Sequence, residues 1–359
     1  MSLGIAGMGW VTPLGSGVTS VWNRLLEGDK ATAETISSPL GQDYPVFRVP
    51  ADALSHAPAH PRLRRSSAIS RFAVVAGLEA LENAGIKIGP ETAARMALIF
   101  AVSNGGVIYT KRFYHDIVES GAQAASPLLF PETVFNAPAS HLAAILGITG
   151  ASYTLVGDGA VGILAMKMAE DLMTSDALDY CLVVGAEEAD WLLCDAYRKW
   201  RLLRSAPPIE PFQRPPKGMI PSEGAGAILL ARDGTLRVEQ IASGTNFRKQ
   251  REAGEGVQKV FAELCRPQPD LVVASANGTF IDAAERAAIS RICPNAEVYA
   301  MKGAIGESVG ASSLWQIICA AQALITQKLP ELPEPTSLKS AVVSTCGLNQ
   351  QVAGLRLTL

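Results

Sequence analysis

Short runs of β-branched and small apolar residues alternate with longer amphipathic runs along this chain, and this alternation restricts the fold class more than any other feature. Residues 97–102 are apolar throughout, as in a strand buried on both faces, whereas residues 71–84 place apolar side chains at helical spacing. Further strand-like runs lie at 3–12, 151–156, 180–185, 270–274, 297–301, 341–345 and 352–357, and further helical runs at 160–173, 281–292 and 308–326. The sequence therefore predicts an α/β fold.

The strand–helix content of the first part of the chain recurs in the last part, which indicates an internal duplication. We predict an N-terminal half at 1–232 and a C-terminal half at 236–359, joined through residues 232–236. Two stretches interrupt the pattern: 29–65 is rich in Pro, Ser and His, and 207–221 contains six prolines. We expect both to be long loops, which in compact domains usually serve a function.

Composition excludes several classes of protein. With 31 basic and 34 acidic side chains, no broad cationic face for nucleic acid is expected. No apolar run reaches the ~18 residues that a membrane span requires, and the first residues lack the pattern of a secretion signal. The six cysteines are scattered, mostly within apolar runs, which is typical of buried thiols in a reducing compartment. We therefore expect a cytoplasmic globular protein.

Several segments together resemble the β-ketoacyl synthase family of the thiolase fold, and they occur in the family's order along nearly the whole chain. The segments are Gly4–Gly15, Trp22–Gly28, Phe135–Ser140, Gly185–Glu188, Pro211–Phe212, Ser222–Ala227, Asn277–Thr279, Lys302 with Gly306, and Cys346–Asn349. The resemblance implies a thiolase-like fold in which two similar halves form a layered α-β-α-β-α architecture. It also implies a family of acyltransferases that act on acyl carrier thioesters.

The resemblance implies catalytic positions that this chain fills with other residues. The nucleophilic cysteine of the family corresponds to Gly159, and its two histidines correspond to Asn277 and Glu307. The family lysine is retained as Lys302, and Leu348 stands where the family has a gating phenylalanine. The four histidines, at 56, 60, 115 and 141, all precede these C-terminal segments. Condensing chemistry is therefore expected to be absent.

Each of these positions also has a purely structural interpretation. Asp158 between two glycines favours a tight strand-to-helix turn over a bound anion or a reactive carboxylate. A buried Glu307–Lys302 ion pair is favoured over Glu307 as a general base. Asn277 is expected to satisfy a backbone group in a turn. Cys194 and Cys346 are more simply core thiols than relocated nucleophiles.

A synthase scaffold without its nucleophile resembles the chain length factors, which pair with a catalytic ketosynthase and bound the length of its product. Those best known carry glutamine where this chain has Gly159. The resemblance implies an interface around residues 153–156 and a heterodimer with a ketosynthase or a homodimer. Side chains that would line the tunnel or gate are Arg112, Phe113, Tyr114, Phe135 and Leu348.

The predicted partners are therefore a ketosynthase and an acyl carrier protein, with no nucleic acid, membrane, cofactor or metal. Two basic clusters are candidates for contact with an acidic carrier protein, namely Arg62, Arg64 and Arg65, and Arg198, Lys199, Arg201 and Arg204. Two alternatives stay open. One is a thioester enzyme whose relocated chemistry uses Glu307, Asp158 or Cys346, and the other is a homodimeric acyl-binding protein.

Overall fold

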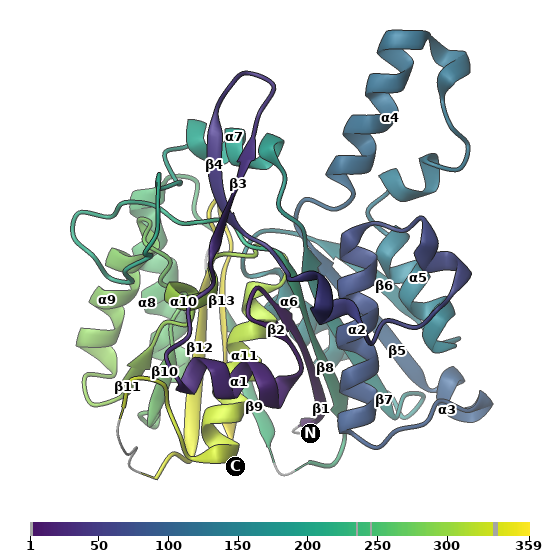
Figure 1. Ribbon diagram of the computed structural model, residues 1–359. Coiled ribbons are helices and arrows are strands. Elements are labelled where there is room, and N and C mark those ends of the chain that lie inside the picture. Colours follow the sequence, from purple (N-terminus) through teal and green to yellow (C-terminus); the bar gives the residue numbers. More distant parts are fainter. Residues whose placement is uncertain (1–2, 235, 245, 333–336) are drawn as a thin grey trace.

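A mixed 11-stranded sheet runs through the whole protein (Figure 1). The computed structural model describes residues 3–234, 236–244, 246–332 and 337–359. The sheet order is β11-β10-β12-β13-β9-β1-β8-β7-β5-β6, with the short β2 (Gly15–Ser16) paired to β1. Its other strands are β1 Leu3–Thr12, β5 Met96–Val102, β6 Ser152–Val156, β7 Tyr180–Glu187, β8 Gly224–Ala231, β9 Arg237–Ser243, β10 Leu271–Val273, β11 Glu297–Tyr299, β12 Ser340–Cys346 and β13 Val352–Thr358.

The two ends of this sheet repeat one pattern of strand order and direction. In one half, β5 is parallel to β6 and β7, while β8 pairs antiparallel with β7 and β1. In the other half, β10 is parallel to β11 and β12, while β13 pairs antiparallel with β12 and β9. The halves join where β1 meets β9. This repeat supports the proposed duplication, whose boundaries at 232 and 236 stay a prediction; Thr235 lies outside the described residues.

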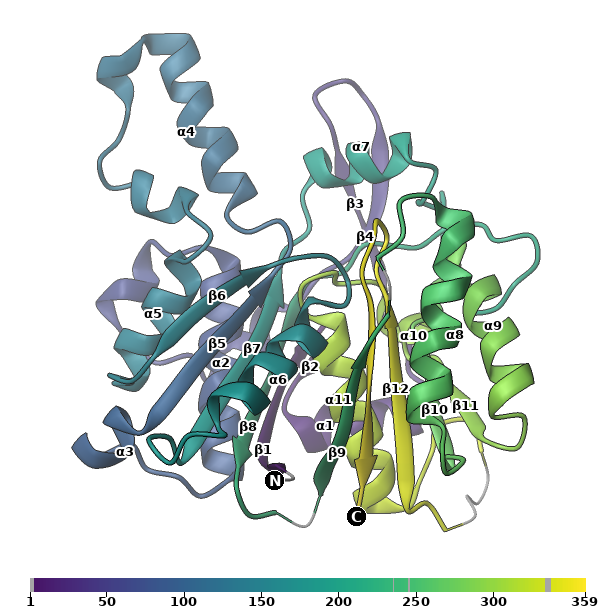
Figure 2. The ribbon, with the colours of Figure 1, turned by 180° about the vertical axis from the view of Figure 1, so that it is seen from behind.

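Helices form three further layers around and between the two half-sheets (Figure 2). α6 (Val161–Leu172) and α11 (Ser312–Thr326) lie between the half-sheets, and small residues let them approach closely. A side chain at Gly162 would collide with Ser313 of α11. α2 (Ala68–Asn83) and α5 (Ala137–Leu146) cover one outer face, and α8 (Ala253–Leu264) with α9 (Ile281–Ile292) covers the other. The predicted layered α/β fold is confirmed.

The predicted loop at 29–65 is wrong in part. It contains an antiparallel hairpin of β3 (Ala33–Ser37) and β4 (Asp43–Phe47), followed by two short 3₁₀ helices, Ala51–Leu54 and Pro61–Arg64. Tertiary contacts hold this hairpin, because Tyr44 and Val46 are buried and the Tyr44 hydroxyl donates to Asp195 at 3.0 Å. Residues 207–221 do form a loop, as predicted, and it is tied to the body where Leu203 pairs with Met219 and Pro221 with Glu307.

Residues 107–135 project from the body as an arm (Figure 1). The arm comprises α4 (Val107–Ser120), the 3₁₀ helices Ala122–Ala124 and Phe130–Thr133, and their connections, and no residue of α4 is buried. The remaining helices are α1 Val18–Leu26, α3 Pro90–Ala94, α7 Trp191–Lys199 and α10 Lys302–Ile305. Among the described residues, no helix has both the length and the apolar character needed to cross a bilayer.

Candidate functional site

Gly159 lies in the tight turn between β6 and α6, where the resemblance places the family nucleophile. The Asp158 carbonyl accepts the Val161 N–H at 2.8 Å and so starts the helix. A side chain at Gly159 would point at the turn after β12, with its Cβ 3.2 Å from the Gly347 Cα. The position therefore has neither a reactive side chain nor ready space for one.

The Asp158 carboxylate ties this turn to the turn after β12. Its Oδ1 accepts the Gly159 N–H at 2.8 Å and the Leu348 N–H at 2.9 Å. Its Oδ2 accepts the Asn349 and Gln350 N–H groups at 2.8 and 3.0 Å. Four backbone donors thus converge on a side chain that is 9% exposed. The predicted tight turn at Asp158 is confirmed, but its side chain does not cap α6 as expected and binds the second turn instead.

This arrangement has a chemical consequence. Backbone N–H groups that converge on one point form a site for a developing oxyanion in acyl-transfer enzymes. Here the N–H of Gly159 and the N–H of Leu348 share one acceptor, Asp158 Oδ1. The protein's own carboxylate therefore occupies the place where a substrate oxyanion at this turn would find donors.

Lys302, Glu307 and Asn277 meet in a buried network. The Lys302 ammonium lies 2.7 Å from Glu307 Oε2, and both side chains are 3% exposed or less, so the predicted ion pair is confirmed. Asn277 Nδ2 donates to the same Oε2 at 2.7 Å, and its Oδ1 accepts from the Thr279 N–H and hydroxyl. Asn277 thus satisfies its own turn, as predicted, and also binds the ion pair.

Ser275 connects this network to the turn that Asp158 holds. Its hydroxyl accepts from the Lys302 ammonium at 3.1 Å and from the Cys346 N–H at 3.2 Å. Cys346 in turn precedes Gly347, against which Gly159 packs. The tertiary structure therefore brings Gly159, Asn277, Lys302, Glu307 and Leu348 into one region, although they come from opposite halves of the chain.

The two thiols near this region are poor nucleophiles. Burial raises the pKa of the Cys346 thiol well above its usual value, and that of Cys194 to about 12. The thiolate is the reactive form, and burial disfavours it more than the nearby cations, Lys302 for Cys346 and Arg48 for Cys194, favour it. The structure therefore supports the interpretation of both as core thiols.

Two further carboxylates at this site went unrecognised in the sequence as functional groups. Glu187 ends β7 and accepts the Ser103 and Asn104 N–H groups, each at 3.0 Å, while Glu188 follows it. Burial raises the pKa of Glu187 to about 8 and that of Glu188 to about 7. The sequence signal that could have identified them is a pair of adjacent glutamates at the end of a predicted buried strand.

These carboxylates line a very small cavity together with Glu307 and Tyr197. Its volume of about 10 Å³ is close to the space that one water molecule occupies. A cavity of this size cannot hold an acyl thioester in the present conformation. The interior of the site is therefore acidic and closed.

The predicted tunnel residues separate into two groups. Leu348 is buried beside Asp158, at the centre of the site. Phe113 packs within the arm against Phe130, with ring centroids 5.7 Å apart. Phe135 ends the arm, is 46% exposed and lies over Gly105. The arm therefore carries four of the five tunnel candidates, Arg112, Phe113, Tyr114 and Phe135, away from the body.

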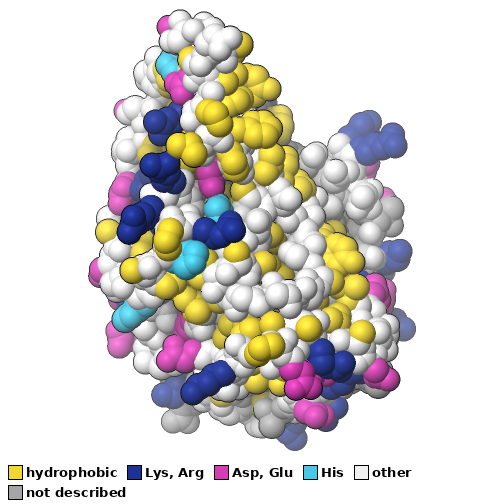
Figure 3. All heavy atoms as spheres, turned by 90° about the vertical axis from the view of Figure 1, so that its right-hand side faces the viewer, with side chains coloured by type: hydrophobic (Ala, Val, Ile, Leu, Met, Phe, Trp, Pro, Cys, Tyr) yellow, Lys and Arg dark blue, Asp and Glu magenta, His cyan; other side chains and the backbone are white. Residues whose placement is uncertain are grey.

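Exposed apolar side chains gather along the arm and on β6, which ends the sheet. Figure 3 shows hydrophobic surface along the projecting arm. Val156 of β6 is 52% exposed, and no other described strand covers the outer edge of β6. The other large exposed apolar residues here are Tyr114, Val118, Leu128, Phe130, Val134, Phe135 and Tyr153. A bare sheet edge flanked by apolar side chains is typical of a surface that a partner covers.

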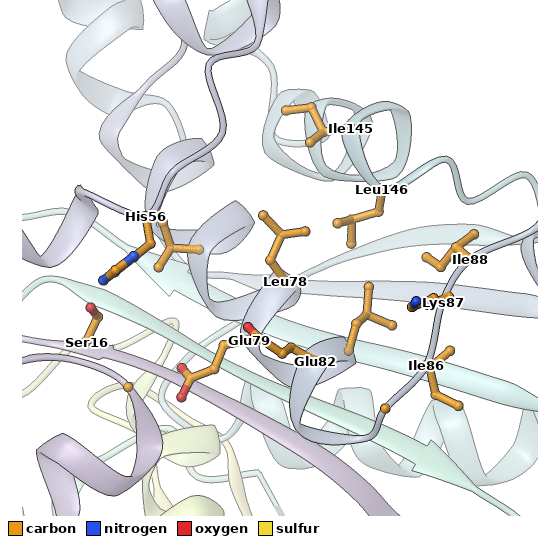
Figure 4. A pocket seen from close by; sticks show the side chains of 14 residues that line it. Ser16, His56, Leu78, Glu79, Glu82, Ile86, Lys87, Ile88, Ile145 and Leu146 are labelled. Carbon is orange, nitrogen blue, oxygen red and sulfur yellow. The ribbon is translucent and has the colours of Figure 1, made fainter.

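A separate cavity of about 910 Å³ lies on the outer face, beside α2 and α5 (Figure 4). Leu78, Ile86, Ile145 and Leu146 line it, with His56 and Lys87 at its edge. Glu79 also borders it, but its carboxylate already accepts the Trp10 and Val18 N–H groups. None of the predicted site residues lines this cavity.

The sequence matches the family model described as "Beta-ketoacyl synthase, N-terminal domain" over residues 2–235. It is 26% identical over 353 residues to nodulation protein E of Rhizobium leguminosarum bv. trifolii, covering 91% of this chain and 87% of that protein. It is 25% identical over 242 residues to 3-oxoacyl-[acyl-carrier-protein] synthase 2 of Vibrio harveyi, where the match spans 63% of this chain and 56% of that protein.

Solved structures share the fold at lower sequence identity. The ishigamide ketosynthase/chain length factor superposes with a TM-score of 0.87 at 19% identity, covering 99% of this chain and 98% of the other. A chain from the complex of a ketosynthase with its chain length factor from Xenorhabdus doucetiae gives 0.86 at 17% identity, covering 100% and 98%. At these identities, the likeness concerns the fold.

Proposed function

This chain belongs to the β-ketoacyl synthase family, and within it we propose a non-catalytic role as a chain length factor. It would pair with a catalytic ketosynthase that builds a polyketide, polyene or fatty acyl chain on an acyl carrier protein. The observation that carries this proposal is the state of the turn at Gly159. The nucleophile position has no side chain, and both adjacent backbone donors bind Asp158.

Features of the interior support the absence of condensing chemistry. Asn277 and Glu307 stand where the family has imidazoles, and Glu307 is bound by Lys302 and Asn277 instead of facing an open cavity. An amide cannot accept a proton as an imidazole does at neutral pH. The cavity beside Glu307 has a volume of about 10 Å³, too small for an acyl chain.

Features of the surface support the pairing. The edge strand β6 exposes Tyr153 and Val156, and the arm beside it exposes Phe130 and Phe135. In this proposal a ketosynthase covers that edge, and the arm reaches over the partner, where its aromatic side chains limit the tunnel. Two solved complexes that share this fold are described as ketosynthases with chain length factors.

Co-expression with a cysteine-bearing ketosynthase from the same organism tests the proposal. We expect the two chains to co-purify, and after incubation with an acyl carrier thioester we expect intact mass spectrometry to find the acyl adduct on the partner alone. An acyl adduct on this chain, or purification without any ketosynthase, would contradict the proposal.

A variant that restores the thiol sharpens this test. Gly159→Cys is expected to remain unacylated, because its thiol would press against Gly347 and the nearby donors would still bind Asp158. The control is the reverse substitution, cysteine to glycine, at the partner's own nucleophile position, which should abolish the adduct there. Acylation of Gly159→Cys would show that only the side chain is missing.

The alternative is a thioester enzyme with relocated chemistry, and it is favoured by the relatives named as 3-oxoacyl-[acyl-carrier-protein] synthases. The protein itself binds or buries its candidate groups: Asp158 binds four N–H groups, Glu307 Oε2 binds Lys302 while its Oε1 has no partner among the described residues, and burial raises the Cys346 pKa. Thioester turnover by the isolated chain that Glu307→Ala or Cys346→Ala abolishes would establish this alternative.

A further inference from the structure

Cys265 and Cys293 are two free thiols in direct contact. Their sulfur atoms lie 3.7 Å apart, although the residues are 28 positions apart in the sequence. Cys265 directly follows α8 and Cys293 directly follows α9, so each stands at the C-terminal end of its helix. A disulfide bond needs a sulfur–sulfur distance of about 2 Å, and the ends of helices adjust more readily than their middles. The fold therefore places both thiols close to a bonding position.

The contact changes the acidity of the two thiols. The Cys265 S–H donates to Cys293 Sγ, which lowers the pKa of the Cys293 thiol, while burial acts in the opposite direction. The pKa of Cys265 is raised by the same hydrogen bond and by burial, whereas Arg356 acts in the opposite direction. Arg356 Nη1 binds the carbonyls of Leu264 and Pro267, at 3.0 and 2.6 Å, which lie on either side of this thiol in the sequence. The pair therefore loses its first proton more readily than a thiol that is merely buried.

Cys181 and Cys319 show how burial alone affects a thiol in this protein. Cys181 lies within β7 and Cys319 within α11, and both are fully buried. Burial raises the pKa of Cys181 to about 12 and also raises that of Cys319. The thiolate is the reactive form, so these two thiols should react more slowly than the pair.

A basin of about 620 Å³ lies beside the pair and is lined by the ends of α8 and α9. Lys259, Arg266 and Arg291 contribute to its lining, and no acidic side chain does so among the described residues. Cys265 also lines the basin and is 2% exposed, whereas Cys293 is fully buried. Partial exposure in electropositive surroundings is typical of reactive cysteines. A small oxidant in the basin would therefore lie next to the pair.

The start of α9 contacts the candidate site. Asp282 Oδ1 accepts the N–H groups of Asn277 and Gly278 at 2.9 and 3.0 Å. Glu285 Oε1 accepts the N–H of Ser275 at 2.8 Å. Both acids belong to α9, and both Asn277 and Ser275 belong to the buried network around Lys302. A covalent bond between the ends of α8 and α9 would therefore fix a helix that holds the candidate site.

We propose that Cys265 and Cys293 form a redox-active dithiol, which hydrogen peroxide converts to an intramolecular disulfide. In the first step a thiolate of the pair attacks one peroxide oxygen, the O–O bond breaks, and hydroxide leaves, which gives a sulfenic acid. In the second step the neighbouring thiol attacks the sulfenic sulfur, the S–S bond forms, and the oxygen leaves as water with the thiol proton. The two sulfurs lose two electrons in total, and the peroxide is reduced to two waters. Thiol reductants reverse the reaction by thiol–disulfide exchange.

Titration of the purified, fully reduced chain with hydrogen peroxide tests this proposal. After each addition the remaining thiols are blocked with iodoacetamide in denaturant and counted by intact mass spectrometry. We expect two of the six thiols to disappear at a peroxide concentration at least about tenfold below that which affects the others. A peptide map should join Cys265 to Cys293, and dithiothreitol should restore both thiols. The absence of this joined peptide, or an equal loss of all six thiols, would overturn the proposal.

Two variants test whether the contact activates the pair. In Cys265→Ala the thiol of Cys293 loses its hydrogen-bond donor, so we expect it to react no faster than the other thiols. Cys181→Ala is the matched control, because it removes a buried thiol from β7 and should leave the disulfide unchanged. Unchanged sensitivity of Cys293 in Cys265→Ala would contradict activation by the contact.

The peptide map of the wild-type chain decides whether the disulfide forms even if a variant does not fold. None of these measurements uses a ketosynthase or an acyl carrier protein. They therefore succeed or fail independently of the proposed function.

Discussion

The buried turn at Gly159 directly follows the exposed edge strand β6 in the sequence. The two regions differ in whether the protein itself satisfies their backbone hydrogen-bonding groups. At Gly159 the backbone donors meet the protein's own carboxylate, Asp158, and the neighbouring cavity is closed. At β6 the outer edge has no neighbouring strand among the described residues, and Val156 is 52% exposed.

This difference teaches where the function of the chain is to be sought. Buried polar groups that are satisfied internally need no ligand, whereas a bare strand edge with apolar side chains is costly to leave in water. The backbone donors of the turn at Gly159, where the resemblance places a catalytic centre, are satisfied by Asp158, whereas the β6 edge, where the resemblance places an interface, has no neighbouring strand among the described residues. Changes on the two sides should therefore affect different properties, namely folding stability inside and association outside.

The largest effect is expected from breaking the interior ion pair. Lys302→Met leaves the buried Glu307 carboxylate without its cation, and we expect the free energy of unfolding to fall by about 4 kcal/mol in urea denaturation. Lys167→Met is the matched control, because Lys167 pairs with Glu170 and Asp171 on the surface, and it should cost less than about 1 kcal/mol. Similar losses in both variants would show that the buried Lys302–Glu307 pair contributes no more to the free energy of unfolding than the surface pairs of Lys167.

The next effect concerns Asp158. Asp158→Ala removes the acceptor of four backbone N–H groups, and we expect a loss of about 3 kcal/mol in the free energy of unfolding. Asp158→Asn keeps one acceptor oxygen and should lose roughly half as much. Equal stability of the alanine variant and the wild-type protein would mean that water satisfies these donors and that the turn is open.

A smaller effect should appear in the dependence of stability on pH. The pKa of Glu187 is about 8 in the folded protein against an ordinary 4.5, so the folded state keeps a proton that the unfolded state loses. This contribution is complete below pH 4.5 and is lost as the pH rises to about 8. Glu187→Gln should therefore gain stability relative to wild type as the pH rises from 5 to 6.5, by roughly 2 kcal/mol.

Unfolding curves at a series of pH values measure this gain. Glu255→Gln, on the exposed face of α8, is the control and should leave the slope unchanged. A Glu187→Gln curve that runs parallel to that of the wild-type protein would mean that Glu187 is ionised in the folded state.

The smallest effect on stability is expected at the outer edge, where the effect on association should be large. Val156→Lys should change the free energy of unfolding by less than about 0.5 kcal/mol, because the side chain is exposed. In the proposed function it should weaken binding to the ketosynthase more than about tenfold, since a charge would be buried at the interface. Val298→Lys on β11, at the opposite edge of the sheet, is the matched control. Equal binding by both variants would remove β6 from the interface.

Much of the fold was predictable because its core elements carry their own pattern. Runs such as 97–102 and 180–185 are apolar throughout, and they are β5 and β7, buried in the half-sheet. The hairpin of β3 and β4 was not predicted, since it is held by contacts such as that between Tyr44 and Asp195, 151 positions apart. Such long-range contacts do not affect the local pattern of apolar residues from which strands are predicted.

The sequence alone determined what is absent from this chain: a glycine stands where the resemblance places the family nucleophile, and no histidine follows position 141. Only the tertiary structure decided what replaces them. It brings Leu348 to Asp158 across 190 positions, so that one carboxylate binds the donors of two turns. It also leaves Arg204 Nε and Nη1 without an acceptor among the described residues, while Arg356 has three acceptors. Residue identity determines which groups exist, whereas packing between distant segments determines which of them are satisfied.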